Sequence, residues 1–101
     1  MLGAKTDAEV VREIGSRLRA HRLQGNVSAA EIAARAGLNR NTVLNAERGV
    51  NPRIETLVRI LRALGRLDSL DAFLPPPALS PLQLVRTAGR PRQRARRRRG
   101  G

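Results

Sequence analysis

Apolar side chains recur along the first 65 residues at the three- and four-residue spacing of amphipathic helices. The first row consists of Val10, Val11, Ile14 and Leu18. Thr6 and Glu9 stand before it in the Ser/Thr-x-x-Glu arrangement of a capping box. Gly25 and Asn26 end it, and both residue types tolerate the left-handed backbone found at helix ends. The pattern predicts a first helix from Asp7 to about Leu23.

Two short helices are expected next, with almost no chain between them. Ser28 and Glu31 form a second capping box at the start of an apolar row that Gly37 ends. That row consists of Ile32, Ala33 and Ala36. Asn39 is a good N-cap for a third helix over residues 40–48, because its side-chain oxygen can accept a hydrogen bond from an unpaired backbone amide.

A fourth helix follows a turn at Asn51 and Pro52. Gly49 is the natural residue just beyond the third helix, and Gly65 ends the fourth. The apolar row of the fourth helix consists of Ile54, Leu57, Val58, Leu61 and Leu64. No stretch alternates apolar and polar residues as a strand would, so the pattern predicts an all-α fold.

A fifth short helix completes the predicted domain, which makes it a five-helix unit. Its apolar residues are Leu67, Leu70, Phe73 and Leu74. Three prolines at residues 75–77 must end any helix, and Ser80 with Pro81 resembles the start of one more brief helical turn.

The chain therefore divides into three parts. Residues 1–74 form the helical domain, and residues 75–86 form a Pro-rich linker with a short helical turn. Residues 87–101 form an Arg-rich tail without apolar periodicity. We expect this tail to be disordered, because it cannot bury enough apolar surface to offset the entropy of ordering it.

The charge adds a class of partner to this picture. The chain has 20 Lys and Arg against 8 Asp and Glu, a net charge of +12. Residues 86–101 contain eight arginines and no acid, so the preceding residues carry twelve basic and eight acidic side chains, a net +4. Such a balance favours an anionic partner, above all nucleic acid. For the tail, docking onto an acidic protein and a role in solubility stay open as alternatives.

Composition argues against several other classes. There is no Cys and only one His, His21, so neither a disulfide framework nor a zinc ligand set is expected, and we expect no metal and no cofactor. Glu47 has no second carboxylate or His near it in the sequence, so no catalytic residues are expected and the pattern is not that of an enzyme. The absence of a long apolar run and of a secretory segment predicts a cytoplasmic protein without a membrane partner.

Two short helices joined by a tight, Gly-containing turn have the sequence form of a helix-turn-helix. Residues 27–65 closely resemble the Cro/repressor-type (XRE) helix-turn-helix family of transcription regulators. The matching features are Ala33 and Gly37 at the helix crossing, Glu47 to Gly49, Pro52, and Glu55 to Leu57. The family often has Gln where this chain has Ala29, and a capping Ser where it has Arg53. The resemblance implies an all-α DNA-binding domain, and Arg53 predicts a weaker cap on the fourth helix.

The third helix has a polar face opposite Val43, Ala46 and Glu47. Arg and Asn are suited to bidentate contacts with guanine and adenine, although an exposed helix face can also be merely polar. The resemblance implies that base edges are read by Arg40, Asn41, Leu44 and Asn45. It assigns phosphate contacts to Thr42, Arg48 and Asn51, and more weakly to Arg53 and to Arg17 or Arg19. Leu44 either contacts a thymine methyl group or a partner protein, or is partly buried.

One such domain covers half of an operator, so the resemblance implies a homodimer on palindromic double-stranded DNA. The apolar residues of the fifth helix either form the dimer interface or complete the monomer core. We therefore predict a dimeric, sequence-specific transcriptional repressor. The order of a small repressor-type domain, a Pro-linked LSPLQLVR segment and an Arg-rich end also resembles antitoxins that pair with HipA-type kinase toxins. An antitoxin that binds a toxin protein and represses its own operon is the alternative.

Overall fold

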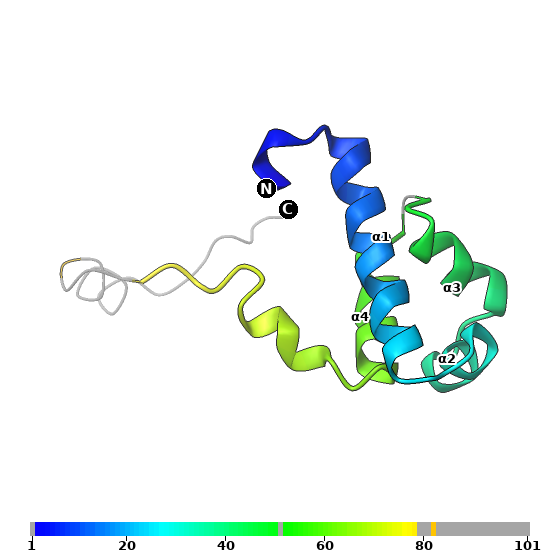
Figure 1. Cartoon of the computed structure of the whole chain (residues 1–101). Helices are drawn as coiled ribbons and strands as arrows, with labels where there is room; N and C mark the ends of the chain where they lie inside the picture. The colour runs from blue at the N-terminus through cyan, green and yellow to red at the C-terminus, as the bar shows by residue number, and fades with distance from the viewer. Residues whose placement is uncertain (1, 51, 79–81, 83–101) are drawn as a thin grey trace, which may run out of the picture.

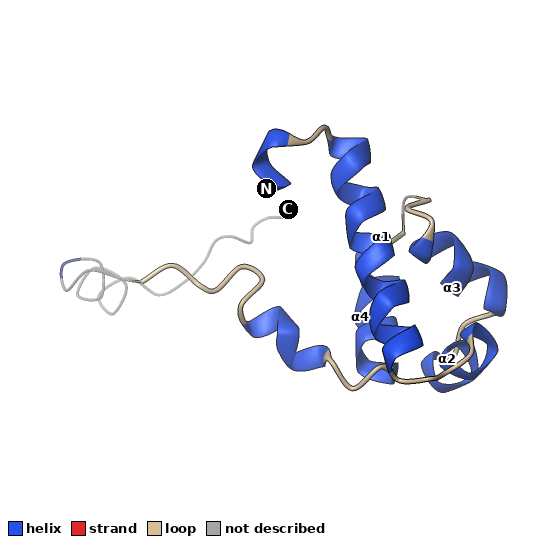
Figure 2. Cartoon of the chain, viewed as in Figure 1, coloured by secondary structure: helices blue, strands red, loops and turns tan. Residues whose placement is uncertain are grey.

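The computed structural model describes residues 2–50, 52–78 and 82, and the described residues contain no strand (Figure 2). The described residues form four α-helices, α1 (Asp7–Gln24), α2 (Ala29–Ala36), α3 (Arg40–Glu47) and α4 (Ile54–Ala63). Two short 3₁₀ helices accompany them, η1 (Leu2–Ala4) and η2 (Leu67–Asp71). The predicted all-α class is therefore confirmed, whereas Asn51, Ser80, Pro81 and the tail of residues 87–101 lie outside the described residues.

α3 contacts each of the other three α-helices, and α2 also packs against α4 (Figure 1). The core cluster consists of Leu18, Ala29, Ile32, Ala33, Val43, Ala46 and Ile60. Ile32, Val43 and Ile60 are its largest fully buried side chains, one each from α2, α3 and α4. Leu18 and three alanines fill the remaining places, and the small alanines of α2 and α3 allow these two short helices to cross closely.

The helix ends follow the sequence closely. Both predicted capping boxes are present, with Thr6 and Ser28 as N-caps. At the end of α1, Asn26 rather than Gly25 takes the left-handed conformation, with φ 57°. In α4 the buried residue is Ile60, whereas Ile54, the first residue of the predicted apolar row, is 81% exposed. Ile54 is the first residue of the helix, and it lies outside the core cluster.

The prediction of a fifth helix, and so of a five-helix domain, is wrong. The segment after Gly65 forms only the 3₁₀ helix η2, without a side-chain cap and without a buried residue. Leu67 and Leu70 are half-buried, but Phe73 and Leu74 are 73% and 78% exposed. A segment that packs only two side chains gains little from extending, and the prolines that begin at residue 75 prevent an α-helix from continuing.

Candidate nucleic-acid interface

α3 begins with the side-chain cap that the sequence predicted at Asn39. The Asn39 Oδ1 atom accepts hydrogen bonds from the backbone N–H of Thr42 at 2.8 Å and from its hydroxyl at 3.0 Å. This cap fixes the first turn of the helix. It also uses the hydroxyl proton of Thr42, so Thr42 must give up this bond before its hydroxyl can donate to a phosphate oxygen.

The outer face of α3 carries four exposed polar side chains. They are Arg40, Asn41, Asn45 and Arg48. The opposite face is buried, with Val43 and Ala46 only 0% and 1% exposed. The structure thus brings three of the predicted base-reading residues and one predicted phosphate-binding residue onto one solvent-facing surface. Guanidinium and carboxamide groups at such positions can donate to and accept from base edges.

Leu44 differs from these four residues. It is half-buried and packs against the hydrophobic core. Arg40, Leu44 and Arg48 follow one another at four-residue intervals, so they form a single row along α3. This row borders the buried side of the helix, because Val43 and Glu47 form the next row around it. Of the alternatives for Leu44, partial burial against a neighbouring element is the one present in the structure.

Glu47 holds the end of α3 through a buried ion pair with Arg22 of α1. The Arg22 Nε and Nη2 atoms donate to the two carboxylate oxygens of Glu47 at 2.7 and 3.0 Å. Both residues are buried, and the hydrogen bond to Glu47 raises the pKa of Arg22 against the lowering effect of burial. Glu47 therefore has a structural role, as the acceptor of a buried arginine. The bidentate geometry fixes the direction of α3 relative to α1.

The sequence patterns did not lead us to predict the buried role of Arg22, although a signal for it existed. It follows Leu18 by four residues, so it continues the apolar row of α1 toward the core. An arginine at such a position requires a buried acceptor. Glu47 is the one acidic residue of α3, and it lies on the buried side of that helix, where it accepts from Arg22.

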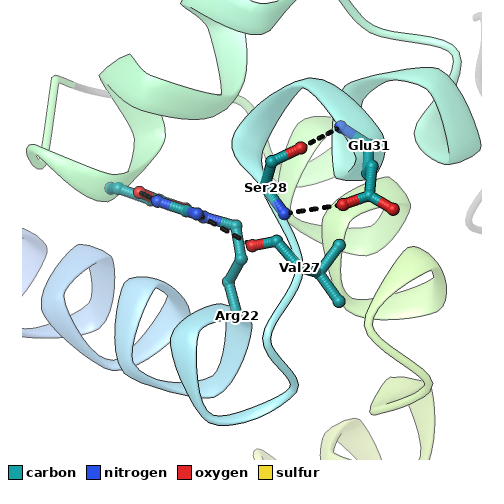
Figure 3. Close-up of polar contacts among 5 residues, drawn as sticks. Arg22, Val27, Ser28 and Glu31 are labelled. Carbon is teal, nitrogen blue, oxygen red and sulfur yellow. Dashed lines mark hydrogen bonds and ion pairs between the residues drawn. The ribbon is translucent and has the colours of Figure 1, made fainter.

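The same arginine organises the turn between α1 and α2. Its Nη1 atom donates to the carbonyl oxygen of Val27 at 3.0 Å (Figure 3). In the next residue, the Ser28 hydroxyl accepts from the Glu31 N–H, and the Glu31 carboxylate accepts from the Ser28 N–H, each at 3.0 Å. The backbone N–H of Ser28, and secondarily its hydroxyl, lower the pKa of Glu31. Because Arg22 bonds to both the Val27 carbonyl and Glu47, this one side chain of α1 links the turn before α2 to the end of α3.

α1 also lies in direct contact with the C-terminal backbone of α3. A Cβ atom added to Gly15 would be 2.5 Å from the Ala46 carbonyl oxygen and 2.6 Å from that of Glu47. Gly49, at φ 76°, lies against Arg12, where an added Cβ would be 2.8 Å from the Cα atom. These approaches leave no room for a side chain at Gly15 or at Gly49. The two glycines therefore let α1 and the end of α3 pack directly against each other.

The predicted phosphate-binding residues are less uniformly placed. Arg53 is exposed and, as predicted, provides no side-chain cap for α4. Arg17 is exposed but its Nε atom pairs with Glu13 at 2.9 Å, one turn earlier on α1. Asn51 lies outside the described residues.

An open hollow of roughly 240 Å³ lies between α3 and the start of α4. Its polar lining consists of Thr42, Asn45, Arg53 and Thr56. Its apolar lining consists of Ala46, Val50 and Pro52. Asn45 and Arg53, a predicted base reader and a predicted phosphate ligand, thus border the same depression.

Within residues 2–50, 52–78 and 82, no three His, Cys, Asp or Glu side chains gather where they could bind a metal ion. None of the described helices has both the length and the apolar character needed to span a bilayer.

Comparison with known proteins agrees with this geometry. A family model described as helix-turn-helix matches residues 18–69, a stretch that begins within α1 and ends within η2. No curated protein matches the chain significantly. The matched stretch covers more than half of the chain and contains the whole of α2, α3 and α4. The chain therefore belongs to the XRE-type helix-turn-helix family of DNA-binding transcription regulators.

Proposed function

We propose that this protein is a sequence-specific transcriptional repressor that binds a palindromic operator as a homodimer, with α3 in the major groove. The observation that carries the proposal is the outer face of α3, where Arg40, Asn41 and Asn45 are exposed while Val43 and Ala46 are buried. The width of the major groove suits one α-helix, and such a face has no partner within the described chain.

Each exposed side chain has a base that suits it. Arg40 is the reader for guanine, whose O6 and N7 atoms accept two hydrogen bonds. Asn41 and Asn45 are the readers for adenine, which offers one donor and one acceptor. Leu44, predicted as a fourth reader, packs against the core, and this supports a role in orienting α3.

Phosphate contacts would come from residues around this face. Arg48 and Arg53 are exposed and support this role most directly. Arg17 would exchange its exposed partner Glu13 for a phosphate, and Thr42 would exchange its bond to Asn39. Asn51 keeps the phosphate role that the family resemblance implies. Such contacts position the helix without reading sequence.

Dimerisation is the second part of the proposal. Leu67 and Leu70 are half-buried beside α4, so they belong to the monomer. Phe73 and Leu74 are largely exposed at the end of the domain, which supports their use in an isologous interface. In this scheme residues 1–74 bind DNA and pair, residues 75–86 are a linker, and the tail of residues 87–101 adds phosphate contacts.

The exposed apolar residues also support the antitoxin alternative. Phe73, Leu74 and Leu82, with 73%, 78% and 60% exposure, all lie near or beyond the end of the domain. In the alternative they would contact a HipA-type kinase toxin instead of a second copy of the chain. A toxin-binding antitoxin of this kind would still use α3 to repress its own operon.

Selection of preferred duplexes from a random DNA library tests base reading. The Arg40→Ala and Asn45→Ala variants should lose the preference for the selected sequence while keeping weak, salt-sensitive binding. Arg62→Ala, which removes an exposed arginine of α4, is the matched charge control and should keep the preference. If both α3 variants retain full preference, α3 is not the reading element.

Sedimentation of the purified protein tests the dimer. The wild-type chain should sediment as a dimer, and a Phe73→Ser/Leu74→Ser variant should sediment as a folded monomer. Ile54→Ser is the control, since it removes an apolar side chain that is 81% exposed at the other end of α4. A monomeric wild-type chain would favour the antitoxin alternative.

A further inference from the structure

The hollow between α3 and α4 lies along one edge of the surface proposed to read bases. Around α3, the exposed row of Asn41 and Asn45 is flanked by the row of Leu44 on one side and by Thr42 on the other. Thr42 and Asn45 both line the hollow. If Asn45 contacts one base pair, the neighbouring base pair would therefore lie over this hollow.

The position of Val50 in the hollow is set by the end of α3. Its backbone N–H donates to the carbonyl oxygen of Asn45 at 2.9 Å, and the N–H of Gly49 donates to Ala46 at 3.1 Å. This pair of bonds, with Gly49 at φ 76°, is the Schellman arrangement that reverses the chain after a helix. It holds Val50 one turn beyond Asn45, at a fixed position relative to that side chain.

The hollow has an apolar wall that is open to solvent. Val50 is 56% exposed, and it stands beside buried Ala46 and half-buried Pro52. An isopropyl group held in this way gains from an apolar partner of about the size of a methyl group. In the major groove of DNA, the partner that fits this description is the C5-methyl group of thymine.

We propose that Val50 is a specificity-determining residue that contacts the methyl group of a thymine next to the base pair read by Asn45. The proposal rests on the proposed function, because it requires α3 in the major groove. It moves the thymine contact from Leu44, which packs against the core, to the side chain that is exposed beside Asn45. Arg53 also lines the hollow, so it is the candidate for a contact with the adjoining phosphate.

Replacing thymine by deoxyuridine tests this, because it removes the methyl group and no hydrogen-bonding group. Each thymine of the selected duplex is replaced in turn, and the affinity of the full-length protein is measured. At one position the replacement should weaken wild-type binding about fourfold, the effect of exposing one buried methyl-sized group. In the Val50→Ala variant this difference between thymine and deoxyuridine should disappear at that position.

Two control variants separate the other outcomes. Leu44→Ala and Ile54→Ala should both keep the difference between thymine and deoxyuridine. The proposal is overturned if the difference disappears in Leu44→Ala but persists in Val50→Ala. It is also overturned if Val50→Ala weakens thymine and deoxyuridine duplexes equally, because Val50 would then contact the sugar-phosphate backbone. A wild-type protein without any sequence preference overturns the proposed function as well, whereas preference without a methyl effect overturns only the role of Val50.

Discussion

Arg22 and Glu47 form a bidentate ion pair in the interior, although they are 25 positions apart in the sequence. The pair joins the end of α1 to the last residue of α3. Since Arg22 also binds the Val27 carbonyl, it connects α3 to the turn that starts α2. The orientation of the outer face of α3, which we propose reads DNA, therefore depends on an interaction in the interior.

Removal of one partner of the Arg22–Glu47 pair should destabilise the domain strongly. Glu47→Ala leaves the buried Arg22 guanidinium without its acceptor, and we expect the free energy of unfolding to fall by about 3–5 kcal/mol. Urea denaturation followed by circular dichroism measures this. Glu13→Ala breaks the exposed pair with Arg17 and should cost at most about 1 kcal/mol. Equal losses in the two variants would show that the interior pair is no stronger than an exposed one.

The Arg22→Met/Glu47→Leu double variant separates pairing from packing. Because it removes both charges and fills the space with apolar groups, it should recover most of the stability that Glu47→Ala loses. A double variant as unstable as the single one would mean that the hydrogen bonds of Arg22 to Glu47 and to the Val27 carbonyl stabilise the fold more than apolar packing does.

The close approach of α1 to α3 predicts that alanine is tolerated differently at Gly15 and at Gly3. In a helix, Gly→Ala ordinarily stabilises by about 1 kcal/mol. At Gly15 the added Cβ would lie 2.5 Å from the Ala46 carbonyl, so Gly15→Ala should instead destabilise by about 1–3 kcal/mol. Gly3→Ala, where nothing lies within 4 Å, is the control and should be neutral. A gain in thermal stability from Gly15→Ala would contradict the packing of α1 on α3.

The N-terminal cap of α2 predicts that the stability of the domain depends on pH in the acidic range. Since Ser28 lowers the pKa of Glu31 from its ordinary value of 4.5, the charged carboxylate stabilises the folded state above that pH. This stability is lost as the pH falls from 4.5 through the lowered pKa. Glu31→Gln keeps an oxygen acceptor but removes the titration, so its stability should vary less than that of the wild type over this range. Parallel curves for the two proteins, from denaturation at several pH values, would contradict the prediction.

The Arg-rich tail should add affinity without adding specificity. Deletion of residues 87–101 removes seven of the eight C-terminal arginines and should weaken binding to all duplexes alike. The plot of log affinity against log salt should flatten by about 0.9 for each phosphate that the tail no longer neutralises. Fluorescence anisotropy over a salt series measures both. Unchanged affinity after the deletion would favour the alternative that the tail docks onto an acidic protein.

The sequence by itself determined the elements whose causes are local. The capping boxes at Thr6 and Ser28 and the cap at Asn39 each involve residues three positions apart. The end of α3 at Gly49 depends on a single left-handed residue. Together with the apolar spacing, these signals located four α-helices, the helix-turn-helix and the polar face of α3.

Only the tertiary structure decided which side chains meet across the fold. Arg22 needs an acceptor from another helix, Gly15 needs α3 against it, and Leu44 becomes half-buried only when the core assembles. The apolar spacing after Gly65 predicted a fifth α-helix, but two of its residues find no core to pack on. Local spacing records which face of a helix is apolar, whereas burial depends on what lies opposite, and that is set by residues distant in the sequence.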